Sequence, residues 1–266
     1  MPARLTILEG HMKPILAAQG LRHYEDFVAI GPGELIHRSR TAETRRLTLD
    51  AGDTLTVFLK VYRYAGRHRR SRLRQDTAER EANNYAVLRE DCGVDVPDVI
   101  AHGSRRRGLR LLDAFILTRG VPDAVPLDAF AARRWPDPTA VGDDPLRRFL
   151  LAETADMVAR MHAIGFYHID LQWRNLLIAA ATAALPRIVV IDSARGAVRR
   201  WSLHRAHGRI RDLSSLHKEA RARLSTREQL RWLRRYLGVR RFRPEHRALI
   251  HTIRHDRGIK DEGPSS

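Results

Sequence analysis

The sequence has a single cysteine, Cys92, in 266 residues. One cysteine excludes an internal disulfide bond, so we expect a reducing compartment, the cytoplasm. Long hydrophobic runs are also missing, because the longest, LLIAAATAAL at 176–185, is about half of the roughly 20 residues that a membrane-spanning helix needs. The segment 1–16, MPARLTILEGHMKPIL, has early charge and lacks the apolar stretch of a signal peptide. These absences predict a chain that neither spans a membrane nor is exported.

Acidic residues and lysine are also scarce. The chain has 48 basic and 31 acidic residues, a net charge of +17, and its only lysines are Lys13, Lys60, Lys218 and Lys260. The arginines cluster at 63–74, 105–110 and 195–211, and such a surface attracts anions. Candidate partners are nucleotide phosphates, phosphorylated glycolipids, an anionic membrane surface or nucleic acid. A general preference for arginine over lysine would explain the excess equally well, and basic segments with interleaved aromatic residues, which favour nucleic acid, do not occur.

Hydrophobic periodicity predicts a β-rich first part and a mainly helical second part. The first part alternates as strands do and contains one helix, for which Asp76 is the expected N-cap. The expected strands lie at 45–50, 54–62, 108–120 and 125–130, and the helix lies at 76–91. Residues 1–40 have no assignment beyond an added strand or a membrane-facing segment.

The second part follows a segment rich in Pro, Asp and Gly, residues 119–145. We expect a helix at about 145–164 that ends at Gly165, two short strands at 175–179 and 187–192, and helices from about 210 to 255. This order gives an N-terminal lobe of residues 1–118 and a C-terminal lobe of residues 119–266.

Three residues between the long helix and the first short strand carry the chemistry. His168, Asp170 and Asn175 fit H-x-D-x-x-x-x-N, the catalytic loop of protein-kinase-like enzymes. Phosphoryl transfer needs a carboxylate that orients the acceptor hydroxyl and takes its proton, and oxygen ligands for a metal. Asp170 suits the first role and Asn175 the second. Alternatively, the stretch is a solvated turn in which Asp and Asn bond their own backbone.

Two residues elsewhere supply the partners that this loop would need. The strand RIVVID ends in Asp192, seventeen residues after Asn175, where the metal-binding Asp of the D-F-G element belongs, although Ser and Ala replace Phe and Gly. Lys60 lies inside the apolar strand TVFLKVY, as in V-A-I-K, and Glu81 is its expected partner, ahead of Glu79. Otherwise, Asp192 is a turn residue and Lys60 protects a strand edge.

The glycine-rich phosphate loop of protein kinases is missing, and Asp212 is a further candidate residue outside the catalytic motif. Between 45 and 60 the only glycine is Gly52, so a G-x-G-x-x-G loop does not occur and phosphate cover must come from a shorter turn or from arginine. Asp212, in RDLSSL, is predicted at a helix start, where it either caps amides of the catalytic loop or is a plain N-cap.

The segments VFLKVYRY, EREANNYAVLREDCGVDVPDVIAHG, GFYHIDLQWRNLLI, IVVIDSARG and RDLSSL together resemble the lipopolysaccharide kinase family, which includes Kdo and core-heptose kinases, over about residues 45–240. The resemblance implies an α+β, bilobal protein-kinase-like fold. It also implies an enzyme that uses ATP and Mg²⁺ to phosphorylate a sugar hydroxyl of lipopolysaccharide at the cytoplasmic face of the inner membrane. It makes Lys60 and Glu81 the nucleotide ion pair, Asp170 with His168 the catalytic residues, and Asn175 and Asp192 the metal ligands.

Other functions stay open at this point. An aminoglycoside-type kinase uses a similar loop, and an atypical Ser/Thr protein kinase is disfavoured by the missing glycine loop. A pseudokinase or anion-binding module would use the arginine surface alone, but every catalytic position is filled. Nucleic-acid binding is the weakest alternative.

Overall fold

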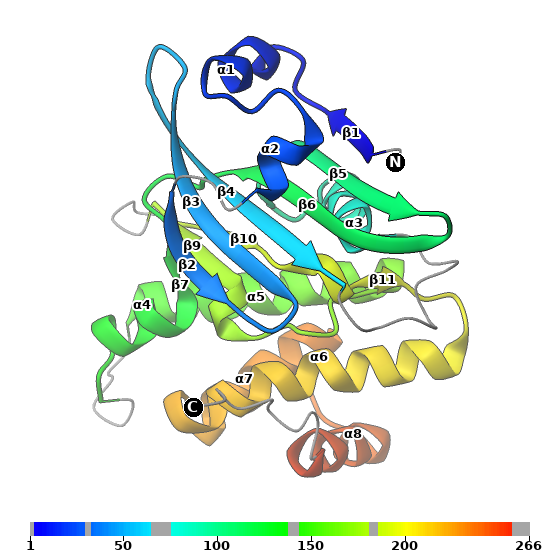
Figure 1. Ribbon diagram of the computed structural model, residues 1–266. Helices are drawn as coiled ribbons and strands as arrows, with labels where there is room; N and C mark the ends of the chain where they lie inside the picture. The colour runs from blue at the N-terminus through cyan, green and yellow to red at the C-terminus, as the bar shows by residue number, and fades with distance from the viewer. Residues whose placement is uncertain (1–2, 30–32, 65–75, 138–143, 181–185, 257–266) are drawn as a thin grey trace. The chain divides into compact units, whose positions relative to one another are not determined.

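The computed structural model describes residues 3–29, 33–64, 76–137, 144–180 and 186–256 (Figure 1). The chain divides into two compact units. Unit 1 comprises Met1–Ala86 and Pro97–Val121, and unit 2 comprises Val87–Val96 and Pro122–Ser266. The expected lobe boundary lies after residue 118, and the chain passes into unit 2 after Val121.

Unit 1 is built on an antiparallel six-stranded sheet, with strand order β1-β5-β6-β4-β3-β2 (Figure 1). The two strands expected at 45–50 and 54–62 are the hairpin β3 and β4, in which Asp50 pairs with Thr54. The strand expected at 108–120 is β6. The strands are β1 (Ala3–Ile7), β2 (Glu34–Arg38), β3 (Ala42–Asp50), β4 (Thr54–Arg63), β5 (Val99–Arg107) and β6 (Arg110–Arg119).

The two faces of this sheet have different covers. One face packs against α1 (Met12–Ala18) and α2 (Tyr24–Val28), where the ring of Phe27 stacks on that of Phe115 at 4.3 Å. Leu59 and Val61 point into this apolar core. Because side chains alternate along a strand, Lys60 lies on the other face, where it meets α3 (Thr77–Glu90).

The first 40 residues therefore belong to unit 1 by packing. They contribute both edge strands of the sheet, β1 paired with β5 and β2 paired with β3, and two helices that cover the sheet. The sequence analysis leaves these residues unassigned, and the structure adds α1 and α2 to the one helix, α3, that is predicted in the N-terminal lobe. Short helices of five and seven residues give little periodicity to recognise in a sequence.

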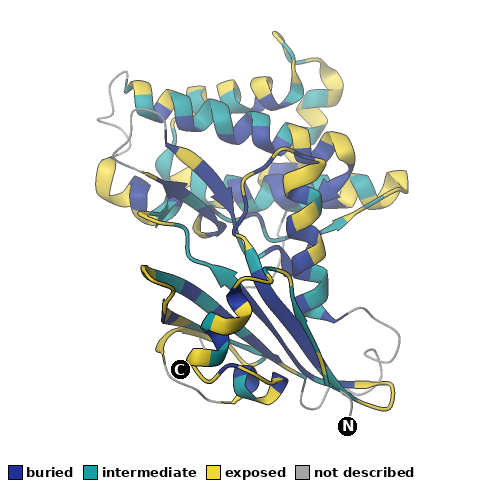
Figure 2. Ribbon diagram, turned by 90° about the horizontal axis from the view of Figure 1, so that it is seen from above, coloured by how far each residue is buried: buried dark blue, intermediate teal, exposed yellow. Residues whose placement is uncertain are grey.

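Unit 2 is mainly helical. The long helix expected at 145–164 is α5 (Pro145–Ile164), which Asp144 caps by accepting from the Leu146 and Arg147 amides. Gly165 ends it at a φ of 88°. The other helices are α4 (Leu127–Arg134), α6 (Ser202–Arg223), α7 (Thr226–Leu237) and α8 (Pro244–His255). The helices carry buried stripes on one side and exposed residues on the other (Figure 2).

Two predictions for unit 2 are wrong. Residues 125–130 are not a strand, because only β7 (Val125–Pro126) is extended and α4 begins at Leu127. Leu127, Phe130 and Ala131 are buried at the spacing of a helix face. Asp212 does not stand at a helix start, because α6 begins at Ser202.

The short strands of unit 2 form two small sheets. One has the order β10-β9-β7, with β9 (Leu176–Ala179) and β10 (Arg187–Val190) as the hairpin that the sequence predicts. The other pairs β8 (Phe166–Tyr167) with β11 (Ala197–Val198). Among the described residues, no helix is both long and apolar enough to cross a bilayer.

Candidate active site

The β9–β10 hairpin brings Asn175 and Asp192 to the same end of one sheet. Leu176 pairs with Val190 in the ladder, and the Ile191 amide donates to the Asn175 carbonyl at 3.0 Å. Asn175 is the residue before β9, and Asp192 follows Ile191. The two predicted metal ligands, seventeen residues apart in sequence, are thus neighbours across the mouth of the hairpin.

Asp170 is tied to the same place by the loop between β8 and β9. The Asn175 side-chain amide donates to the Asp170 carbonyl at 2.9 Å, and so does the Gln172 backbone amide at 2.9 Å. These bonds fold residues 170–175 into a tight turn that ends in the 3₁₀ helix η1 (Trp173–Asn175). Asp170 and Asn175 therefore belong to one rigid turn, as the H-x-D-x-x-x-x-N spacing predicts.

The Asp170 carboxylate has a partner that the sequence motif does not name. The Gln172 side-chain amide donates to Asp170 Oδ1 at 2.5 Å, and both side chains are partly exposed. This bond restricts rotation of the carboxylate. Gln172 is thus a positioning residue for the predicted base.

His168 of the catalytic motif lies inside the protein. Its side chain is fully buried, and Nε2 donates to the Ile191 carbonyl at 3.0 Å. A buried imidazole bonded to backbone is suited to holding the loop in place, and the assignment of His168 to the catalytic residues beside Asp170 stays a prediction. His168 fastens the catalytic loop to the residue that precedes Asp192.

Asp212 is the anchor of the loop. Its carboxylate, which is fully buried, accepts from the His168 amide at 2.8 Å and from the Ile169 amide at 2.6 Å. Ile169 has a φ of 71°, which a β-branched residue adopts only under strain of about 1–3 kcal/mol. The predicted capping of loop amides is therefore confirmed, although Asp212 acts from the middle of α6.

A chain of hydrogen bonds supports Asp212 from behind. Arg209 Nε donates to the Tyr236 hydroxyl at 2.7 Å, and Tyr236 lies 2.8 Å from His162 Nδ1. Because the Asp212 carboxylate accepts from His162 Nε2 at 3.2 Å, Nδ1 of the neutral ring is the acceptor and takes the hydrogen bond of the Tyr236 hydroxyl. Burial raises the pKa of Tyr236 to about 12, so it stays protonated and remains a donor.

Unit 1 contains the predicted ion pair. Lys60 Nζ lies 3.5 Å from Glu81 Oε1, and Glu81 also accepts from the Tyr62 and Tyr85 hydroxyls. Glu81 is 2% exposed. Glu79 instead pairs with Arg4, and its amide donates to the predicted N-cap, Asp76. The pairing of Lys60 with Glu81 is therefore confirmed, and its role in nucleotide binding stays a prediction.

The donor set at the hairpin mouth fits a magnesium ion that brings its own oxygen ligands. Among the described residues, no group of three or more His, Cys, Asp or Glu side chains forms a complete metal site. One carboxylate and one amide oxygen are the kind of incomplete, all-oxygen set by which proteins hold Mg²⁺ together with phosphates and water. Asn175 and Asp192 would hold the ion in this way.

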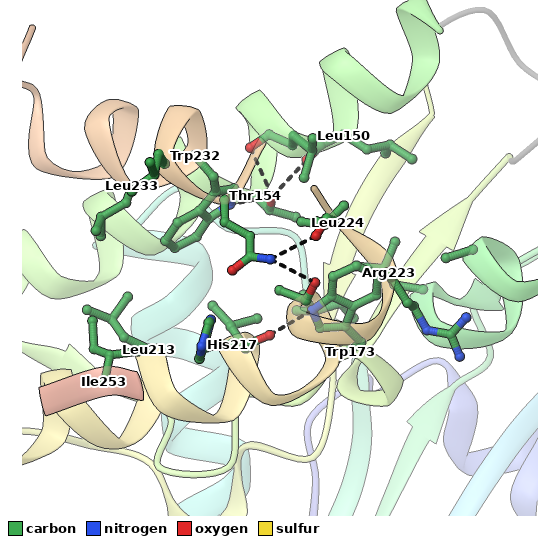
Figure 3. A pocket seen from close by; sticks show the side chains of 18 of the residues that line it. Leu150, Thr154, Trp173, Leu213, His217, Arg223, Leu224, Trp232, Leu233 and Ile253 are labelled. Carbon is green, nitrogen blue, oxygen red and sulfur yellow. Dashed lines mark hydrogen bonds between the residues drawn. The ribbon is translucent and has the colours of Figure 1, made fainter. Parts of the chain in front are cut away.

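An apolar cavity of about 110 Å³ lies in unit 2 (Figure 3). Trp173 of η1 forms one wall, and its Nε1 donates to the Leu216 carbonyl at 3.2 Å. Trp232 forms another and donates to Thr154 Oγ1 at 3.0 Å. His217 also lines it, and burial, with Arg221 and Arg254, lowers the pKa of that imidazole. Trp173 therefore packs inside unit 2.

The family model described as "Lipopolysaccharide kinase (Kdo/WaaP) family" matches residues 40–236. The chain is similar to a solved structure, "WaaP in complex with acyl carrier protein", with a TM-score of 0.70 and 23% identity, over 94% of this chain and 96% of that one. In all, 1168 chains of known structure match, so the fold is widespread and does not separate substrates. Among the curated proteins none matches significantly.

The family match covers well over half of the chain and includes every predicted site residue, from Lys60 to Asp192. The fold agrees with the β-rich and helical parts of a kinase, as the sequence predicts. The chain therefore belongs to the lipopolysaccharide kinase (Kdo/WaaP) family and is a kinase.

Proposed function

We propose that this kinase transfers the γ-phosphate of ATP to a sugar hydroxyl of the lipopolysaccharide core or of Kdo. The observation that carries the proposal is the turn at 170–175, which joins Asp170, through its backbone carbonyl, to Asn175 and, through the hairpin, to Asp192. Phosphoryl transfer requires of a protein a base for the acceptor and oxygen ligands for a metal. In unit 2, Asp170 suits the first role, and Asn175 and Asp192 suit the second.

Each residue has a defined part in the reaction. The acceptor oxygen forms a bond to the γ-phosphorus, the bond from that phosphorus to the β–γ bridging oxygen breaks, and ADP leaves. Asp170, held by Gln172 through Oδ1, receives the hydroxyl proton. The ammonium of Lys60, fixed by Glu81, binds phosphate oxygens of the nucleotide. Magnesium, when bound by Asn175 and Asp192, supplies positive charge that offsets the phosphate charge.

The arginine surface supports an anionic acceptor. With a net charge of +17, the protein attracts phosphorylated glycolipids, and a lipid-linked acceptor would bring it to the cytoplasmic face of the inner membrane as a peripheral protein. The arginine cluster at 63–74 lies almost wholly outside the described residues. The clusters at 105–110 and 195–211 lie in the described chain, in the β5–β6 hairpin and at the start of α6.

A phosphate-transfer assay tests the proposal. The acceptors are lipopolysaccharide from a strain that lacks this protein, a generic protein substrate and an aminoglycoside, with labelled ATP and Mg²⁺. We expect transfer to lipopolysaccharide, lost in Asp170→Ala and Asp192→Ala and kept in the control Asp156→Ala, an exposed aspartate paired with Arg235. Transfer only to the protein or to the aminoglycoside would refute the substrate class.

A nucleotide-binding measurement separates the kinase from a pseudokinase or anion-binding module. The melting temperature should rise with ATP, and more with ATP and Mg²⁺ together, because the metal ligands act only with the ion present. A rise that is independent of both Mg²⁺ and Asp192 would favour the anion-binding module.

A second proposal concerns a protein partner. The similar WaaP structure was solved in complex with acyl carrier protein. We propose that this basic chain also binds a carrier protein of that kind, supported by its charge of +17 and by the apolar cavity beside Trp173. Purified carrier protein should elute with the chain in gel filtration, and separate elution at low salt would refute the proposal.

A further inference from the structure

Large apolar side chains are exposed together near the start of α6. Trp201 is 75% exposed, Leu203 is 83% exposed and Val198 is 45% exposed. Ile164, at the end of α5, is 46% exposed. A single exposed apolar residue needs no explanation, but several in one place mark an interaction site. We call Ile164, Val198, Trp201 and Leu203 the apolar patch.

Hydrogen bonds hold the backbones of the patch close together. Val198 pairs with Phe166 in the β8–β11 ladder, and the Arg199 amide donates to the Gly165 carbonyl at 2.8 Å. Ile164, next to Gly165, therefore lies beside this segment. Arg205 Nη2 lies 3.4 Å from the Ala163 carbonyl and ties α6 to the same end of α5. The patch thus has an ordered support.

The charge around the patch has one sign. Residues 195–211, RGAVRRWSLHRAHGRIR, contain six arginines and two histidines and no acidic residue. Arg195 and Arg200 are exposed on either side of Val198. The next carboxylate along the chain, Asp212, is fully buried and engaged with the catalytic loop. The patch therefore presents apolar groups within a basic surrounding.

We propose that the apolar patch and its arginines bind an anionic membrane surface. A tryptophan and aliphatic side chains that stand in water insert at the level of lipid headgroups, and arginines beside them bind the anionic lipids. An acidic protein would also attract the arginines. The membrane is favoured because the exposed tryptophan and leucine lie in a segment, 195–211, that has six arginines and no acidic residue, the pattern of an interfacial segment.

The position of the patch relates it to the reaction. Phe166, the partner of Val198, precedes Asp170 by four residues, so the chain keeps Val198 within about 20 Å of Asp170. Docking at the patch would present a lipid-linked sugar to that carboxylate. The inference deepens the proposed function and rests on it for the acceptor, but membrane binding itself requires neither ATP nor acceptor.

Vesicle sedimentation with the full chain tests the apolar part. The probes are vesicles of phosphatidylcholine alone and of phosphatidylcholine mixed with phosphatidylglycerol. We expect binding to the mixed vesicles, weakened at least about tenfold by Trp201→Ser with Leu203→Ser. The control is Leu8→Ser, because Leu8 is 55% exposed but is followed by Glu9. Equal binding by the patch variant and the control would overturn the proposal.

Matched arginine variants test the charge. Arg195→Gln with Arg200→Gln should weaken binding to mixed vesicles by about fivefold for each arginine. Arg240→Gln with Arg241→Gln, a pair of exposed arginines in the α7–α8 connection, should leave it nearly unchanged. Equal losses in both pairs would show a non-specific charge effect and overturn the assigned surface.

Tryptophan fluorescence gives a second readout. Because Trp201 is exposed, its emission should shift to shorter wavelength on mixed vesicles, and Trp201→Phe should abolish the shift. Protection of Trp201 by acyl carrier protein and not by vesicles would overturn the proposal in favour of a protein partner. Vesicle binding without phosphate transfer would uphold the patch while the proposed function fails, so the two failures are distinguishable.

Discussion

Replacement of Asp212 tests how the catalytic loop is held. Asp212→Ala removes a fully buried carboxylate that accepts from the His168 and Ile169 amides and from His162 Nε2, and leaves these three donors without their acceptor. An unsatisfied buried donor costs about 1–3 kcal/mol, so three give about 3–9 kcal/mol. The strained φ of Ile169 also loses its restraint, and relaxation of the loop would recover part of that cost. We expect a loss of about 3–5 kcal/mol in the free energy of unfolding.

Urea denaturation of the wild type and two aspartate variants would measure this loss. The matched control is Asp156→Ala, which removes an exposed ion pair with Arg235. A surface pair contributes about 0–1 kcal/mol. A free energy of unfolding for Asp212→Ala within about 1 kcal/mol of the control would refute the anchoring role.

Three further predictions follow from the described contacts. Lys60→Met should lower kcat/KM for ATP about a hundredfold or more, because the ammonium fixed by Glu81 is lost. Steady-state kinetics would measure this, and a loss under about tenfold would contradict the role of Lys60 in nucleotide binding. Gln172→Met keeps the length of the side chain but removes the donor to Asp170, so it should lower kcat about tenfold and leave KM for ATP unchanged. Gln172→Lys restores a donor and should recover kcat. A rise in KM alone would contradict the positioning role of Gln172. Burial opposes ionisation of Glu228, but hydrogen bonds from Arg147 and Ser225 prevail and lower its pKa, so its contribution to stability is present above the ordinary pKa and is lost as pH falls through the folded value. Glu228→Gln should therefore cost more free energy of unfolding at about pH 7 than at about pH 3, and an equal cost at both would contradict this.

The local parts of the site were predictable because they depend on fixed spacing. The distance in sequence from Asp170 to Asn175 sets one turn, and Asp192 lies two residues after a strand, β10, whose partner begins after Asn175. Lys60 was recognisable as a lysine between Leu59 and Val61, and strand alternation alone puts it on the face opposite their core.

Long-range contacts were not predictable in the same way. The Gln172 bond to Asp170 depends on a side-chain rotamer, and the link from Tyr236 through His162 to Asp212 joins three helices. Burial of His168 likewise follows from how α6 packs on the loop, which the H-x-D string does not encode.

The start of α6 was missed for a physical reason. Residues 202–210 are basic and show no stripe of apolar residues at helical spacing. They also include Gly208, and glycine usually breaks helices. In the structure a Cβ at Gly208 would lie 2.5 Å from Tyr167 Cγ, so the glycine is needed where β8 packs on the helix. The same glycine that obscures the helix in sequence allows α6 to reach the catalytic loop.

The most direct test of the central claim is product analysis after incubation with ATP, Mg²⁺ and lipopolysaccharide from a strain lacking this protein. Mass spectrometry should show one added phosphate on a core or Kdo sugar with the wild type, and none with Asp170→Asn. Phosphorylated sugar formed equally well by the Asp170→Asn variant would contradict the account.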